Sequence, residues 1–125
     1  MEPVVTVGRI RIHAARLTAE VRRRAVPRLV RCGALVERAA KESMQGGGTA
    51  GAPSPPGTPP NVQTGVLRAS IAHAATGVGT VVVGPTEWTG KVHEFGGRNH
   101  PERPFMRPAL KDCVTRFPGE FRGLA

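Results

Sequence analysis

The cluster of side chains that most resembles a metal site in this sequence is His93, Glu94 and His100. Imidazole nitrogens and carboxylate oxygens are ordinary zinc ligands, and a loop between two histidines can bring both to one ion. However, the sequence contains no HExxH motif, which places two ligands and a general base on one helix. It also contains no second acidic residue at the spacing of metal-dependent nucleases. We therefore expect no metal site.

Other catalytic patterns are also missing from the sequence. No serine stands in a nucleophile-elbow motif, and no cysteine and histidine form a protease signature. The glycines 46–48 are not followed by the GK[ST] of a phosphate-binding loop. Cys32 and Cys113 stand alone, as small core residues of a reduced protein do. We expect a protein that is not an enzyme and holds no cofactor.

The charge balance is strongly basic. Eighteen Lys and Arg oppose nine Asp and Glu, which gives a formal charge of +9. Four arginines fall on one side of a predicted helix, away from its apolar stripe: Arg24, Arg28, Arg31 and Arg38. They either form a solvated face or contact DNA or an acidic neighbour. No aromatic stacking platform or groove-reading motif accompanies them, so we expect no sequence-specific recognition.

The first half of the chain predicts a strand and a long helix. Residues 4–12 are rich in β-branched side chains and predict a short strand interrupted at Gly8. Residues 14–44 predict a helix with an apolar stripe at spacings of three and four. The stripe consists of Leu17, Val21, Ala25, Leu29, Cys32, Val36, Ala39 and Ser43. Pro27 lies within it and should kink or divide the helix.

A long loop separates the two halves. Residues 45–62 contain five glycines and five prolines, a composition that cannot bury apolar surface. We predict a mobile loop that is able to thread onto a neighbouring subunit. The residues after it are too few and too weakly apolar to fold without the first helix, so residues 1–125 form one domain. No apolar run is long enough for a membrane span, and we expect no membrane association.

The second half predicts a hairpin and two helices. Residues 63–70 predict a turn, and residues 71–76 and 80–84 predict the two strands of a hairpin. Residues 87–95 predict a short helix with Trp88, Val92 and Phe95 on one side, ended by Gly96 and Gly97. A last helix should begin near Phe105 or Met106. The predicted fold class is α+β: a long N-terminal helix on a small, mostly antiparallel sheet, with a short C-terminal helix.

Three elements, in this order, carry a resemblance to a known family. They are TGVLRASI (64–71), HEFGG (93–97) and HPERPFMRPAL (100–110). Together with the basic helix before them, they resemble the head–tail connector, neck or tail-completion proteins of tailed phages of the siphovirus type. The stretch HEFGG also resembles part of the related virion-morphogenesis proteins. The loop 45–62 is longer than the family's usual connection.

The resemblance implies a structural virion protein that forms a homo-oligomeric ring at the head–tail junction. Six copies are favoured and twelve are the alternative, around a DNA channel, between head-closure or adaptor proteins and the tail tube or its terminator. Assembly would take place in the bacterial cytoplasm. The alternative is a small basic nucleic-acid-binding or regulatory protein, free of any ring.

The residues from the end of the short helix to the last helix are the predicted docking surface. Gly96 and Gly97, with the nearby prolines, predict a rigid, sharp turn that carries charges. We expect Glu94 to meet an arginine of the next subunit. The alternative is that the charges are solvated and the two phenylalanines are core. The residues are Glu94, Phe95, Gly96, Gly97, Arg98, Arg103, Phe105 and Arg107.

Overall fold

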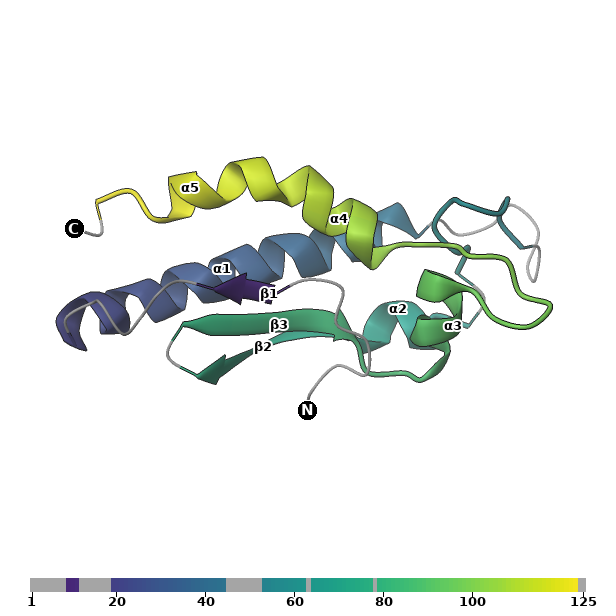
Figure 1. The fold of residues 1–125 in the computed structure, drawn as a ribbon, viewed down its shortest axis with the longest axis horizontal. Coiled ribbons are helices and arrows are strands. Elements are labelled where there is room, and N and C mark those ends of the chain that lie inside the picture. Colours follow the sequence, from purple (N-terminus) through teal and green to yellow (C-terminus); the bar gives the residue numbers. More distant parts are fainter. Residues whose placement is uncertain (1–8, 12–18, 45–52, 63, 78, 124–125) are drawn as a thin grey trace.

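The computed structural model describes residues 9–11, 19–44, 53–62, 64–77 and 79–123. The described elements form an α+β fold in which one long helix lies between a sheet and a second helical layer (Figure 1). In chain order they are β1 (Arg9–Arg11), α1 (Ala19–Ser43), α2 (Val66–Ser70), β2 (Ile71–Gly77), β3 (Thr80–Pro85), α3 (Thr89–Phe95), α4 (Met106–Cys113), the 3-10 helix η2 (Val114–Arg116) and α5 (Phe117–Glu120). The predicted fold class is confirmed.

The long helix α1 forms because its apolar residues recur every three or four positions. Its buried positions include Ala25, Leu29, Cys32 and Val36, as the spacing predicts. Beyond Val36 the buried stripe shifts by one position, from the predicted Ala39 and Ser43 to Ala40 and Met44. A helix packed on two sides has to bury more than one narrow stripe, and α1 contacts both the sheet and α4.

Pro27 does not divide α1, contrary to one of the two predicted outcomes. A proline inside a helix leaves the carbonyl one turn earlier without its N–H partner. Pro27 is exposed, so water can solvate that carbonyl. The buried neighbours Ala25 and Leu29 hold the helix on both sides of the proline.

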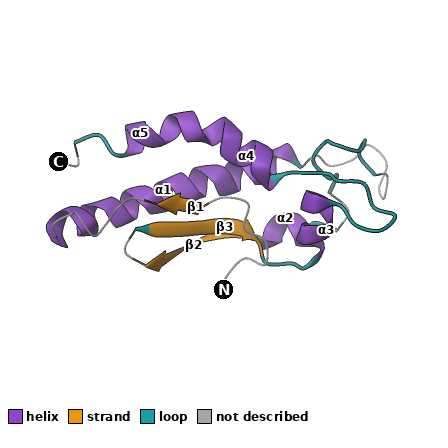
Figure 2. Cartoon of the chain, in the orientation of Figure 1, coloured by secondary structure: helices purple, strands orange, loops and turns teal. Residues whose placement is uncertain are grey.

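The described strands form one antiparallel sheet of three, in the order β1-β3-β2. The predicted hairpin is confirmed as β2 and β3, which lie side by side in Figure 2. In its register His73 is opposite Val83. Residues 9–11 of the predicted first strand form β1 against Val81 and its neighbours, while residues 4–8 and 12 lie outside the described residues. Gly33 lets α1 approach the sheet closely, because a Cβ there would lie 2.6 Å from Cγ1 of Val81.

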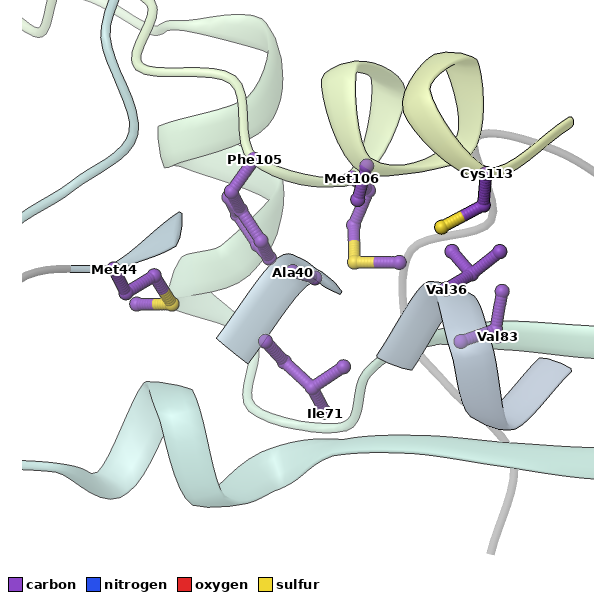
Figure 3. Packing of buried hydrophobic residues seen from close by; sticks show 9 residues of the cluster. Val36, Ala40, Met44, Ile71, Val83, Phe105, Met106 and Cys113 are labelled. Atoms are coloured by element: carbon purple, nitrogen blue, oxygen red, sulfur yellow. The ribbon is translucent and has the colours of Figure 1, made fainter. Parts of the chain in front are cut away.

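The main core lies between α1, the sheet and α4 (Figure 3). Phe105 and Met106, at the start of α4, are completely buried there against α1 and β2 residues. Full burial of such a side chain contributes roughly 1.5–3 kcal/mol. The core residues are Val36, Ala40, Met44, Ile71, Val83, Phe105, Met106, Ala109 and Cys113. The packing of these two side chains in the core therefore fixes the position of the start of α4.

Two predictions for the loops need correction. Residues 63–70 were expected to form a turn, but Val66–Ser70 form the short helix α2 behind Gly65, whose φ is 87°. The described part of the predicted mobile loop, residues 53–62, is tied to the chain: the Gly57 N–H donates to the carbonyl of Glu102 at 2.8 Å, and Arg103 Nε donates to the carbonyl of Ser54 at 2.9 Å. Residues 45–52 lie outside the described residues. None of the described helices has the length and apolarity to cross a membrane.

Candidate functional site

Glu94, in the last turn of α3, is a completely buried carboxylate. Its Oε1 accepts the backbone N–H groups of Phe105 at 3.1 Å and Met106 at 2.8 Å, and its Oε2 accepts that of Arg107 at 3.2 Å. These N–H groups stand at the start of α4, where they have no acceptor within the helix. Glu94 is therefore an N-terminal cap of α4, supplied from another helix, and its charge suits the positive end of the helix dipole.

The local sequence explains why α4 needs a cap from elsewhere. Serine, threonine, aspartate or asparagine commonly fills the position before a helix and caps it. Phe105 stands there instead, and it offers no side-chain hydrogen bond. Since Phe105 is needed in the core, the acceptor has to come from another segment. We call Glu94, the three N–H groups it accepts and the Arg107 side chain the Glu94 cap.

Arg107 closes the Glu94 cap from the solvent side. Its Nε donates to Oε2 of Glu94 at 2.9 Å, and its Nη2 donates to the Glu94 carbonyl at 2.9 Å and pairs with Oε1 of Glu102 at 3.0 Å. The guanidinium also lies 5.5 Å from the ring centre of Phe95. The hydrogen bond to Glu94 is the main reason that the pKa of Arg107 is raised. One side chain thus joins the end of α3 to the start of α4.

The turn between α3 and α4 is held by backbone hydrogen bonds. Gly97 and His100 each donate an N–H to the carbonyl of the other at 3.0 Å, and the Arg103 N–H donates to the carbonyl of His93. Gly96 has a φ of 76°, and a Cβ there would lie 3.2 Å from the His100 carbonyl oxygen. The sharp turn expected from the glycines and prolines is present, and Gly96 is the glycine that it requires.

The structure buries some of the predicted docking residues and exposes others. Glu94 and Phe105 are completely buried, so the prediction that Glu94 meets an arginine of another subunit is wrong, because its arginine partner is Arg107 of the same chain. Arg103 is bound to the 53–62 segment. Phe95 and Arg98 are exposed. Arg98 forms no ion pair or hydrogen bond through its side chain with another described residue.

His93, Glu94 and His100 do not form a metal cluster. Among the described residues, no group of three His, Cys, Asp or Glu side chains could hold a metal ion. The oxygens of Glu94 face N–H donors, which occupy the lone pairs that a metal would need. Burial, followed by the charge of Arg103, lowers the pKa of His93.

The four arginines predicted on one face of α1 are all engaged within the chain. Arg24 pairs with Glu20 at 3.2 Å, Arg31 with Glu120 at 2.9 Å and Arg38 with Glu42 at 2.9 Å. Arg28 donates to the carbonyls of Glu120 and Arg122. Arg28 and Arg31 therefore fix the end of α5 on α1, and the remaining two form pairs along the helix.

Exposed apolar side chains gather at the end of the molecule formed by α2 and α3. Of the four large apolar residues exposed in the described chain, Val66, Trp88 and Phe95 lie on or next to these helices, and they are 58%, 70% and 50% exposed. The fourth, Val114, lies on η2. Residues of α2 and α3 line an open cleft of about 290 Å³. Its walls include Met44, Val62, Val66, Leu67, Arg68, Glu87, Thr89 and His93.

The Glu94 cap and the cleft were both missed in the sequence, although one signal for the cap exists. A predicted helix that begins at Phe105 or Met106 without a capping residue before it requires an acceptor from elsewhere, and Glu94 is one of two glutamates in the preceding turn region. For the cleft no comparable signal exists, because its walls come from three separate segments. No protein-family model, curated protein or solved structure matches the chain.

Proposed function

We propose that this chain is a structural subunit of a tailed-phage virion, present as a ring at the head–tail junction. In this role it connects the portal side to the tail tube around the DNA channel. The ring is built from copies of the chain, six being favoured and twelve the alternative. Its work is mechanical: it holds neighbouring proteins in a fixed geometry and catalyses no reaction.

The Glu94 cap is the observation that supports this proposal most directly. It joins two of the three sequence elements that carry the resemblance, HEFGG and PFMRPAL, through four hydrogen bonds to the Glu94 carboxylate. The first element adjoins them: the carbonyl of Ser70 accepts the Thr86 N–H at 3.0 Å, and Leu67 lies beside Gly90 of α3. Residues far apart in the sequence thus maintain one rigid corner, as a repeated docking element requires.

The engaged arginines of α1 argue against the alternative, a free nucleic-acid-binding protein. A side chain that already pairs with a carboxylate or a carbonyl of its own chain gains less from a phosphate. Arg28 and Arg31 hold α5 in place, so their use for DNA would cost packing of the fold. Among the described residues, Arg24 and Arg38 pair only with glutamates of α1 itself, so they can still add a non-specific contact with packaged DNA without loss of packing.

The test is to look for the protein in purified virions of the phage that encodes it. We expect it in a fixed number of copies, with immunolabelling at the head–tail junction in electron micrographs. Absence from purified virions would refute the proposal. Native mass spectrometry of the purified chain adds the copy number, because a closed ring gives one dominant multiple of the subunit mass.

The same protein preparation tests the alternative. A free nucleic-acid-binding protein would bind duplex DNA with an affinity that falls steeply with salt, and it would form no ring. That result, together with absence from virions, would establish the alternative. A ring that binds duplex DNA only weakly, with little dependence on sequence, is the outcome that the proposal expects.

A further inference from the structure

The outward face of α3 is an exposed amphipathic surface. Gly90 and Glu94 are buried on the inner side of the helix, while Trp88 and Phe95 are exposed. Trp88, Val92 and Phe95 follow one another at spacings of four and three, so they share one side of the helix. Lys91 is exposed between them. We call these four residues, Trp88, Lys91, Val92 and Phe95, the α3 face.

The cleft adjoins the α3 face. Thr89 and His93, which line the cleft, lie one residue after Trp88 and Val92 and therefore on the neighbouring side of the same helix. The exposed Val66 of α2 also lines the cleft. Much of the wall is apolar, and its volume of about 290 Å³ is enough for one large apolar side chain. Exposed aromatics beside an apolar cavity are the usual centre of a protein interface.

Three cations around this surface have no partner among the described residues. Arg68 lines the cleft, Lys91 lies on the α3 face and Arg98 lies in the turn after α3, all three exposed. Among the described residues, none of these three side chains has an ion pair or hydrogen-bond partner. Of the acidic residues nearby, Glu102 is paired with Arg107, whereas Glu87 accepts only the neutral N–H and hydroxyl of Thr89 and keeps its negative charge. The three cations outnumber this one acid. The surface therefore complements carboxylates.

The described residues of a second copy are a poor source of those carboxylates. The chain carries a formal charge of +9. Every described glutamate is already engaged by a partner in the same chain. Of the described acidic residues, only Asp112 has neither an ion pair nor a hydrogen bond. The α3 face thus fits a different protein better than a second copy of itself.

We propose that the α3 face and the adjoining cleft bind an acidic segment of another protein. The segment inserts one apolar side chain between α2 and α3, covers Trp88 and Phe95, and pairs its carboxylates with Arg68, Lys91 and Arg98. The expected binding of an acidic segment depends only on the residues of this surface. Only the identity of the partner, a neighbouring virion protein, rests on the proposed function. Self-association in a ring would then use other surfaces.

Trp88 provides the assay, because it is the single tryptophan of the chain and lies on the proposed surface. The probe is a synthetic peptide with a Phe-Leu pair between acidic residues. We expect it to shift the Trp88 emission to shorter wavelength and to saturate at about 0.1–1 mM peptide, as short segments commonly do. A peptide with Ala-Ala in place of Phe-Leu, and one with lysines in place of the acids, should bind at least about tenfold more weakly.

Matched variants locate the binding. K91E/R98E should weaken peptide binding by about tenfold or more. The control K111E/R116E changes two exposed cations on α4 and η2 and should leave the peptide affinity unchanged. Val66→Glu should weaken binding as well, with Val114→Glu as its control, since both valines are about half exposed. All these positions are exposed, so circular dichroism should show folded proteins.

Three results would overturn the inference. The first is no emission shift with any peptide, or equal loss in the variants and their controls. The second is a shift with oligothymidylate and none with the peptide, which would assign the surface to nucleic acid. The third is a shift of the protein alone with rising concentration, which would assign it to a second copy. Peptide binding without incorporation into virions refutes only the proposed function, and incorporation without peptide binding refutes only this inference.

Discussion

Removing the Glu94 carboxylate should destabilise the fold far more than removing any exposed glutamate. In Glu94→Ala, the N–H groups of Phe105 and Met106 lose their acceptor at a site that water does not reach. A buried donor left without a partner costs about 1–3 kcal/mol. The Arg107 donors are partly exposed and can turn to water or Glu102. We expect a loss of about 3 kcal/mol, which is a large part of the roughly 5–15 kcal/mol typical of a domain.

Glu94→Gln removes the negative charge but keeps an oxygen that can accept hydrogen bonds from α4. The amide oxygen can still accept the Phe105 and Met106 N–H groups, but its NH2 group then faces the Nε donor of Arg107. We expect a smaller loss, about 1–2 kcal/mol. The control is Glu102→Ala, which removes a half-exposed ion pair to the same arginine and should cost less than about 1 kcal/mol.

Urea denaturation followed by far-ultraviolet circular dichroism measures these differences. The midpoint should fall in the order Glu102→Ala, Glu94→Gln, Glu94→Ala, with an unchanged slope. Thermal melting should show a drop of about 10–15 °C for Glu94→Ala. If Glu94→Ala and Glu102→Ala agree within about 0.5 kcal/mol, the assignment of Glu94 as the cap of α4 is refuted.

Three further predictions concern other parts of the fold. Gly90→Ala should lower the free energy of unfolding, measured by urea denaturation, by about 1–3 kcal/mol, because the new Cβ would lie 2.5 Å from Cγ of Pro85. Gly119→Ala has open space around it and should be neutral or slightly stabilising. Equal effects of the two substitutions would contradict this prediction. Burial raises the pKa of Glu37, but the hydrogen bonds from His73 and Lys41 outweigh it, and the net pKa is lowered from 4.5. A carboxyl group whose pKa is lowered in the folded protein adds stability at pH values above its unfolded-state pKa, and this stability is lost as the pH falls through its folded-state pKa. The difference in free energy of unfolding between wild type and Glu37→Gln should therefore shrink below about pH 4.5. A difference that grows there would contradict this assignment. Burial, with Glu120 beside it, raises the pKa of Cys32 to about 11, so this thiol should react with a disulfide reagent at pH 8 only when the protein unfolds, and rapid reaction of the native protein would contradict its burial.

The regular elements were predictable because their signals are local. The apolar spacing of α1, the β-branched residues of β3 and the glycines after α3 each act within a few residues. The phase of the α1 stripe beyond Val36 was not predictable, because α4 packs on a second side of the helix and draws Ala40 and Met44 inward. Gly65 was interpreted as part of a turn, yet its positive φ starts α2.

The site residues were harder to predict, because their roles depend on contacts between segments. From the sequence alone, the glutamate of the HEFGG stretch is equally suited to docking and to capping, and only the position of α4 decides between them. The arginines of α1 were predicted on the correct helix, but two of them, Arg28 and Arg31, have partners about ninety residues away, at Glu120 and the nearby carbonyls. Trp88 was expected on the same helix side as Phe95, and its exposure follows from Gly90 and Glu94 facing the core.

The Glu94 cap also affects how the molecule opens in solution. The first N–H groups of a helix ordinarily exchange with solvent deuterium quickly, because they have no acceptor within the helix. Those of Phe105 and Met106 are buried and bound to Glu94, so they can exchange only when α3 and α4 separate. Their exchange rates therefore report how often the corner opens, and they distinguish that local event from complete unfolding of the core.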